Sequence, residues 1–218
     1  MPEALKDRVR ARMKDVLRDF AVANRSLPPE PPPGLLRKML SSGAGGPVPE
    51  EYIPMILEEM NLGDQDPKTV HWRARPSDEA LAAFQVVIIG AGVSGLGIAI
   101  KLKEAGIPFI IYEKNETVGG TWLENSYPGR GVDTPNHFYS LSFEPNHDWP
   151  DHFSKRDQLW AYMERIADQY DLRRHIRFNT EVSGAIYDEV RAVWTVTAGG
   201  SVIEANFAIK SSNISAGR

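Results

Sequence analysis

Hydrophobic residues near the start of the chain recur at steps of three and four positions. This spacing predicts an amphipathic helix over residues 4–24, because side chains three and four apart share one helix face. The proline-rich run SLPPEPPPG ends that helix and predicts a semi-rigid, extended spacer. Two shorter helices are expected at LLRKML and from Glu50 to Asn61. We interpret residues 1–84 as a helical N-terminal extension that packs on another domain or on a second subunit.

From Gln85 onward the pattern changes to short runs of β-favouring residues separated by glycine and proline. The first three runs predict a strand, a helix and a second strand: VVIIG, VSGLGIAIKLKEAG and PFIIYE. After a long loop, a further helix is expected from Lys155, capped by Ser154. The remainder, ending in SVIEANFAI, predicts short strands with a hairpin turn at Gly199-Gly200. Residues 85–218 are therefore predicted to form an α/β, Rossmann-like domain of three layers, with a parallel sheet followed by a β-meander.

Charge and composition exclude several classes of partner and site. The 25 basic and 29 acidic side chains give a net charge of −4, so neither nucleic acid nor an anionic membrane is an expected partner. The chain has no cysteine, which excludes disulfides, thiolate metal ligands and a cysteine nucleophile. His147 and His152 lie beside acidic residues but lack the spacing of a four-ligand set, so no metal is expected. With no secretory signal and no membrane-length apolar run, we expect a cytoplasmic protein.

A glycine motif stands between the first predicted strand and its helix. Gly90, Gly92 and Gly95 match G-x-G-x-x-G, which makes a tight turn, lets the backbone approach a pyrophosphate, and packs the helix on the strand. A P-loop would need Lys and Ser or Thr at the positions of Leu96 and Gly97. A nucleophile elbow around a serine would need glycine at Leu96 as well. The motif therefore predicts a dinucleotide site.

The second strand supplies a carboxylate at the expected distance. Glu113 lies 23 residues after Gly90, close to the spacing of about 20 that is typical of a ribose-binding acid. A carboxylate here accepts hydrogen bonds from ribose hydroxyls and repels a 2′-phosphate. This half of the site should therefore hold FAD or NAD rather than NADP.

The downstream sequence resembles a known family. VVIIGAGVSGLG together with EKNETVGGTWLENSYPGRGVDTPNHFYSLSF resembles the flavin-dependent Baeyer–Villiger monooxygenases, and is most similar to the hydroxyacetophenone-type subgroup. Members of that subgroup carry a helical N-terminal extension, part of which looks like VPEEYIPMILEEMNLGD. The resemblance covers nearly the whole chain, and GGTW…YPG…D is more specific than the glycine motif alone. It implies an FAD- and NADPH-dependent enzyme that inserts oxygen into a small ketone to give an ester or lactone.

The resemblance also implies roles for individual residues. The implied cofactor-binding residues are Gly90, Gly92, Ser94, Gly95, Glu113, Lys114, Gly120, Thr121, Trp122, Asp133, Tyr139 and Val182. Asp133 is the expected catalytic residue, because the family's aspartate after YPG lies near the isoalloxazine. Isoalloxazine needs an apolar, aromatic wall, and nearby aromatic residues are candidates to build it: Trp122, Tyr127, Phe138, Tyr139 and Phe143.

The chain departs from the family pattern in three ways, one of which is that the family's His-and-Trp-Pro signature after the first dinucleotide motif is absent. Arg130 stands one position before the family's usual arginine, whose place is held by Gly131. No second G-x-G-x-x-G for NADPH occurs before Arg218, so we expect a truncated chain that binds FAD but does not oxidise a ketone by itself. Two alternatives stay open: a non-catalytic FAD- or NAD-binding or oligomerisation module, in which the N-terminal helices form a homodimer, and another flavoprotein such as an N-hydroxylating monooxygenase.

Overall fold

The structure is a computed structural model that describes residues 2–23, 31–60 and 69–211. The chain divides into two compact units, Met1–Asp66 and Pro67–Arg218. The division therefore lies earlier than the expected boundary between residues 84 and 85. Trp72 illustrates why, because its Nε1–H donates a hydrogen bond to the carbonyl of Ala105 within the second unit, at 3.0 Å.

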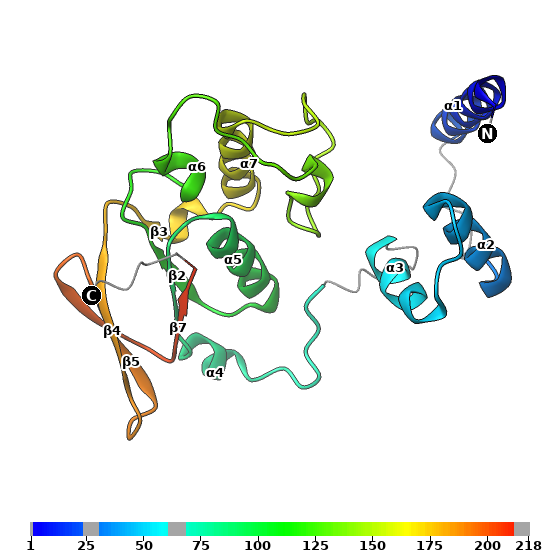
Figure 1. Ribbon diagram of the computed structural model, residues 1–218. Helices are drawn as coiled ribbons and strands as arrows, with labels where there is room; N and C mark the ends of the chain where they lie inside the picture. Colours follow the sequence, from blue (N-terminus) through cyan, green and yellow to red (C-terminus); the bar gives the residue numbers. More distant parts are fainter. Residues whose placement is uncertain (1, 24–30, 61–68, 212–218) are drawn as a thin grey trace. The chain divides into compact units, whose positions relative to one another are not determined.

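The first unit is helical, as the sequence predicts. Its elements are α1 (Glu3–Val22), α2 (Pro33–Ala44), a 3₁₀ turn (Glu50–Tyr52) and α3 (Ile53–Met60) (Figure 1). Proline stands in the first turn of α2, where its missing N–H costs no helical hydrogen bond. Asn61, the expected end of the third helix, lies outside the described residues.

Parallel strands form the centre of the second unit. Among the described residues, the sheet has the order β3-β2-β1-β7: Ile176–Arg177, Phe109–Tyr112, Val86–Ile89 and Phe207–Lys210. All neighbouring pairs in it are parallel. Helix α5 (Val93–Ala105) connects β1 to β2, and α7 (Arg156–Gln169) lies between β2 and β3 in sequence. The short helices α4 (Asp78–Ala82) and α6 (Thr121–Glu124) were not expected.

The β-meander forms a separate antiparallel sheet. It contains β4 (Val182–Asp188), β5 (Val193–Ala198) and β6 (Ser201–Ala205), with the expected hairpin turn between β5 and β6. The last predicted strand, SVIEANFAI, is divided, because the chain turns at Asn206 and then joins the parallel sheet as β7. Asn206 Oδ1 accepts a hydrogen bond from the Gln85 N–H at 2.8 Å, which holds this turn against the start of β1.

Alternate residues of β1 contact two different cores, which makes the unit three-layered. Ile88 belongs to the core formed with α5 and α7, whereas Val87 packs against Val196 and other residues of the meander. The predicted three-layer α/β fold is therefore confirmed. The N-cap of α7 is Lys155 rather than Ser154, whose fully buried side chain finds no hydrogen-bond partner among the described residues.

Candidate dinucleotide-binding site

The loop between β1 and α5 is shaped by its glycines. Gly90 has φ 98°, a left-handed conformation that L side chains rarely adopt. A Cβ added to Gly95 would lie 2.1 Å from the carbonyl oxygen of Gly90, so the helix packs on the loop without room for any side chain. Helix α5 begins after Gly92 without a side-chain cap, which leaves its first N–H groups without a side-chain acceptor.

The GGTW segment contacts this loop directly. The Gly119 N–H donates to the carbonyl of Ala91 at 3.1 Å. Gly120 has φ 49°, and a Cβ built on it would lie 3.0 Å from the Cα of Gly92. Two segments that are far apart in sequence therefore meet backbone to backbone, and Gly120 is the N-cap residue of the short helix α6 at that contact.

Glu113 lies at the end of β2 with its carboxylate turned toward the glycine loop. Oε2 accepts a hydrogen bond from the Ala91 N–H at 2.7 Å. Oε1 accepts two, from the backbone N–H of Asn115 at 2.9 Å and from its side-chain Nδ2 at 2.8 Å. A carboxylate offers about four acceptor positions, so the described residues leave one of them, on Oε2, for a ligand. The residue is 3% exposed and lines the cavity described next.

A cavity of about 620 Å³ lies where these elements meet. Ten of the residues assigned to cofactor binding from the sequence line it: Gly90, Gly92, Ser94, Glu113, Lys114, Gly120, Thr121, Trp122, Tyr139 and Val182. Gly95 lies beneath the loop instead, where it packs α5 against Gly90. Asp133 is exposed and is not part of this lining, so the structure does not bring its carboxylate to the cavity.

Several lining residues were not singled out from the sequence. Ser211 follows β7, and its Oγ lies 2.8 Å from the carbonyl oxygens of both Ile89 and Gly90. Thr180 and Glu181 follow β3. These residues could have been identified from the strand order, because each follows a parallel strand and ligands of parallel sheets bind beyond the carboxyl ends of the strands.

A fixed aromatic pair forms one wall. Trp122 Nε1–H donates to Tyr139 Oη at 2.9 Å, and the two rings meet edge to face at 5.6 Å. The guanidinium of Arg130 lies 4.6 Å from the Trp122 ring and donates to the carbonyl of Asn125 at 2.6 Å. Because Arg130 is largely buried, its cation and the hydrogen bond together hold Trp122 in place.

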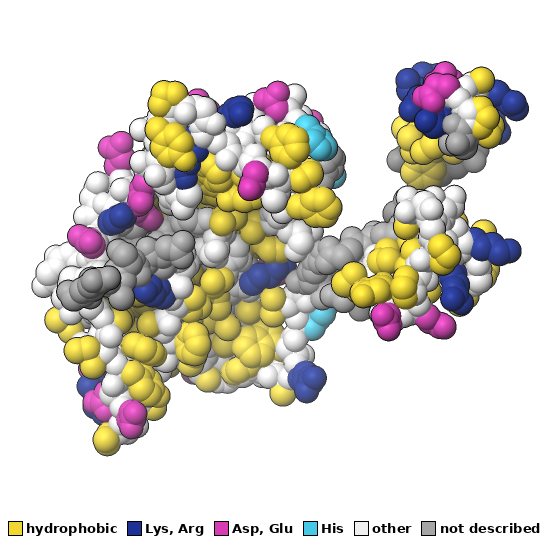
Figure 2. Space-filling view, in the orientation of Figure 1, with side chains coloured by type: hydrophobic (Ala, Val, Ile, Leu, Met, Phe, Trp, Pro, Cys, Tyr) yellow, Lys and Arg dark blue, Asp and Glu magenta, His cyan; other side chains and the backbone are white. Residues whose placement is uncertain are grey.

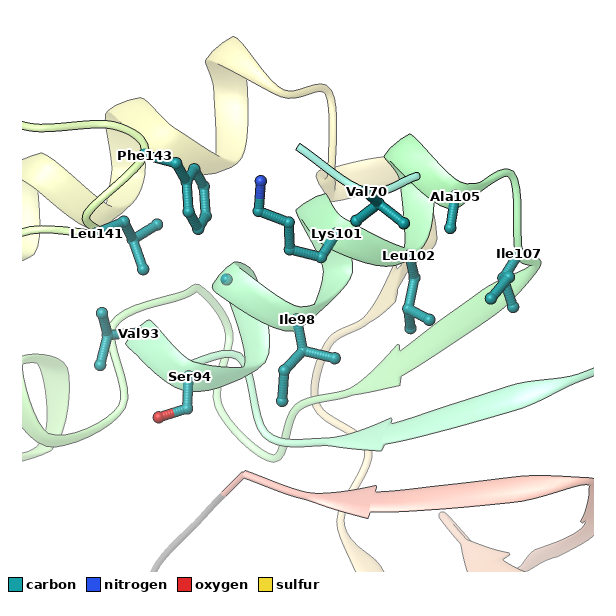
Figure 3. Close-up of a pocket in the computed structure, with 11 residues that line it drawn as sticks. Val70, Val93, Ser94, Ile98, Lys101, Leu102, Ala105, Ile107, Leu141 and Phe143 are labelled. Carbon is teal, nitrogen blue, oxygen red and sulfur yellow. The ribbon is translucent and has the colours of Figure 1, made fainter. Parts of the chain in front are cut away.

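The other aromatic candidates lie elsewhere. Tyr127 and Phe138 are exposed. Phe143 belongs to a second concavity of about 590 Å³, which runs along α5 (Figure 3). Figure 3 shows Lys101 beside Phe143, with its Nζ 4.1 Å from the ring centroid. Apolar side chains dominate this second concavity, so it lacks the convergent polar groups that a dinucleotide needs.

Two charged residues that line the cavity, Lys114 and Glu124, form an ion pair. Lys114 Nζ lies 3.0 Å from Glu124 Oε1. The hydrogen bond between them raises the pKa of Lys114 and lowers the pKa of Glu124, so both are charged near neutral pH.

Within the described ranges, no group of three or more His, Asp and Glu residues is arranged to hold a metal ion. In the same ranges, no helix has the length and apolarity that crossing a bilayer requires.

Comparisons with known proteins agree with this geometry. Residues 88–156 match the family described as NAD(P)-binding Rossmann-like domain. The chain is 44% identical over 113 residues to a Baeyer–Villiger monooxygenase of Streptomyces coelicolor, covering 51% of this chain and 22% of that protein. It is 43% identical over 115 residues to the FAD-binding monooxygenase moxY of Dothistroma septosporum, covering 52% of this chain and 18% of that protein. The chain thus spans about a fifth of the length of these relatives.

Solved structures of the same class share the fold of the second unit. The structure of OTEMO in complex with FAD and NADP superposes with a TM-score of 0.57 at 37% identity, covering 62% of this chain and 27% of that one. Oxidized steroid monooxygenase bound to NADP gives a TM-score of 0.56 at 36% identity, covering 58% of this chain and 25% of that one.

Proposed function

We propose that the cavity of the second unit holds FAD, because the chain is similar to Baeyer–Villiger and FAD-binding monooxygenases. The observation that carries the proposal is the contact of three motifs around one cavity. Gly92 meets Gly120 backbone to backbone, and Glu113 is hydrogen-bonded to the loop between them. A mononucleotide would need only the glycine loop and the acid, whereas the GGTW segment extends the lined surface beyond them.

The residues of the cavity fit the parts of a dinucleotide. The uncapped start of α5 offers N–H groups to a pyrophosphate, and the free acceptor position of Glu113 suits a ribose hydroxyl. Trp122 and Tyr139 offer an apolar surface with fixed polar edges at the flavin end. Val182 lines the cavity, and in this assignment it contacts the adenosine end of the dinucleotide. When bound, FAD supplies the two-electron redox chemistry on which oxygen insertion depends.

We propose further that the full activity is NADPH-dependent insertion of oxygen into a ketone, and that this chain does not perform it alone. The described cavity is accounted for by one dinucleotide, which leaves hydride delivery to another part of the protein. The exposed carboxylate of Asp133 is accessible to such a part, in keeping with the catalytic role that the resemblance implies for it. NADPH-driven ester formation by the isolated 218-residue chain would contradict this proposal.

FAD binding is tested by titrating the purified chain with FAD and following flavin fluorescence and visible absorption. Gly92→Ala is the informative variant, because its Cβ would meet the Gly120 Cα at 3.7 Å, an ordinary contact. The variant should fold, yet its methyl group occupies the space in which the backbone approaches the pyrophosphate. We expect its dissociation constant for FAD to rise by about tenfold or more. A wild-type chain that folds but binds no FAD would refute the proposal, and preferential binding of NAD would favour the alternative nucleotide module.

A second proposal concerns the first unit, which we infer forms a homodimer through α1. This helix has no buried residue, although its apolar positions form a stripe at helical spacing: Leu5, Val9, Met13, Val16 and Leu17. Figure 2 shows hydrophobic side chains next to the charged ones on this helix. A matching stripe from a second copy would cover this surface.

Neighbouring substitutions on α1 test the homodimer. Met13→Glu places a charge in the stripe, whereas Lys14→Glu places one about 100° further round the helix, outside the stripe. Light scattering after size-exclusion chromatography should give a dimer for the wild type and Lys14→Glu, and a monomer for Met13→Glu. A monomeric wild type, or a dimer that Met13→Glu leaves intact, would contradict the proposal.

A further inference from the structure

Asn115 joins two carboxylates at the rim of the cavity. Its Nδ2 donates to Glu113 Oε1 at 2.8 Å and to Glu124 Oε1 at 3.1 Å. Its backbone N–H donates to the same Glu113 oxygen at 2.9 Å. Glu113 directly follows β2, Glu124 ends α6, and both line the cavity. One amide group therefore connects the strand that carries the ribose acid to the helix that follows Gly120.

The arrangement needs a side chain at this position that donates to both carboxylates. Two carboxylates that share a partner repel each other, and the repulsion is offset only if that partner donates to both. Lys114 adds one further contact, to Glu124. The other charged groups around this cluster are Glu181, which acts on Lys114, and Arg130, which acts on Glu124. Asn115 is the group that supplies donors to both Glu113 and Glu124 among the described residues.

We propose that Asn115 is a positioning residue for the dinucleotide, which sets the orientation of the Glu113 carboxylate and ties it to α6. The proposal rests on the proposed FAD site. By filling both acceptor positions of Oε1, Asn115 leaves Oε2 to face the Ala91 N–H and the ligand. By its second donor, it holds the segment that begins with Gly120 at a fixed distance from Glu113. The adenosine end and the flavin end of the cavity are thereby positioned by one side chain.

Asn115→Asp tests this role with a nearly isosteric change. It replaces the shared donor by a third carboxylate about 3 Å from the other two. The two neighbouring carboxylates should raise the pKa of the introduced aspartate, since a like charge disfavours ionisation. At lower pH the side chain takes up a proton and regains one O–H donor. A defect in FAD binding that shrinks as the pH falls is therefore the signature of the bridging role.

The experiment measures the dissociation constant for FAD at pH 8 and pH 5.5 by quenching of flavin fluorescence. We expect Asn115→Asp to weaken binding about tenfold or more at pH 8 relative to the wild type, and by less than about threefold at pH 5.5. Asn115→Ala, which removes the donors without adding charge, should weaken binding several-fold to a similar extent at both pH values. Asn146→Asp is the matched control, because Asn146 Oδ1 accepts a hydrogen bond, which a carboxylate retains. Its affinity should equal that of the wild type.

The outcomes separate the two proposals. If the wild type binds no FAD, the proposed function fails and the role of Asn115 fails with it. If the wild type binds FAD and Asn115→Asp binds equally well at pH 8, or with a defect that does not depend on pH, the bridging role alone is overturned. Circular dichroism of each variant confirms that it folds. Should Asn115→Asp not fold, wild-type affinity in Asn115→Ala overturns the role.

Discussion

Substituting alanine at Gly95 should lower stability, whereas alanine at Gly97 should leave stability unchanged or raise it, although both residues lie in α5. Alanine is favoured over glycine inside a helix by up to about 1 kcal/mol, so propensity alone predicts that both variants gain stability. The surroundings of the two positions differ. A Cβ at Gly95 would lie 2.1 Å from the Gly90 carbonyl oxygen and 2.8 Å from Ser211 Oγ. A Cβ at Gly97 would meet only the end of the flexible Leu141 side chain, at 3.1 Å.

The magnitude for Gly95→Ala follows from the contact that must be relieved. Ordinary contact begins at 3.4 Å, so α5 and the glycine loop must separate by about 1.3 Å. Because the obstacle is backbone, overpacking should cost about 3 kcal/mol, the upper end of its usual range. The gain in helix propensity reduces the net loss to about 2 kcal/mol. For a unit of this size, that loss lowers Tm by about 4–8 °C. Gly97→Ala should leave Tm unchanged or raise it by up to about 4 °C.

Tryptophan fluorescence is a suitable assay because all five tryptophans lie in the second unit. Thermal and urea unfolding of the FAD-free chain, followed by this signal, report the second unit without interference from the first. The reasoning is refuted if Gly95→Ala is as stable as the wild type, or if the two substitutions shift Tm by the same amount. Either result would mean that the contact between Gly95 and Gly90 is easily relieved.

Two further predictions concern the turn before β7 and the half-buried phenol of Tyr170. Asn206→Ala leaves the Gln85 N–H without its acceptor, so it should reduce the free energy of unfolding in urea by about 1–2 kcal/mol, while Asn206→Asp should retain most of it. Burial, and then the hydrogen bond to Glu144, raise the pKa of Tyr170 to about 12 from 10. The stability due to this shift is fully present below pH 10 and is lost as the pH rises through 12, so Tm of the wild type should fall more steeply over that interval than Tm of Tyr170→Phe. Equal slopes would contradict this assignment.

The sequence predicts the parts of the fold that local chemistry determines. The strand, glycine loop and helix from Val86 to Ala105 form as expected, because the glycines that they need lie within a few residues of one another. Glu113 is predicted by its spacing alone, and it lies in the cavity. Helix α4 was missed although Ser77 accepts a hydrogen bond from the Ala80 N–H, a capping signal that is legible in the sequence.

Other features depend on contacts between distant residues. SVIEANFAI reads as one strand, and its division at Asn206 depends on a hydrogen bond to Gln85, which is 121 residues away. The exposure of Asp133 also depends on how its loop is held. The Asn136 side-chain amide accepts from the Ser154 N–H at 2.7 Å and fixes the chain beside Asp133. Neither contact has a signature in local composition or periodicity.

The contact between Gly92 and Gly120 explains why GGTW is a more specific signal than the glycine motif. A glycine loop before a helix requires only its own strand and helix. Gly120, by contrast, must adopt φ 49° and approach within contact distance of Gly92, so its identity depends on a second segment that is already in place. The position of Ala91 depends on distant segments in the same way. Its carbonyl accepts a hydrogen bond from the Gly119 N–H, and its own N–H donates to the Glu113 carboxylate. The glycine loop, Glu113 and the GGTW segment therefore fix one another's positions around the cavity. A side chain at Gly120 should disturb both ends of the cavity at once.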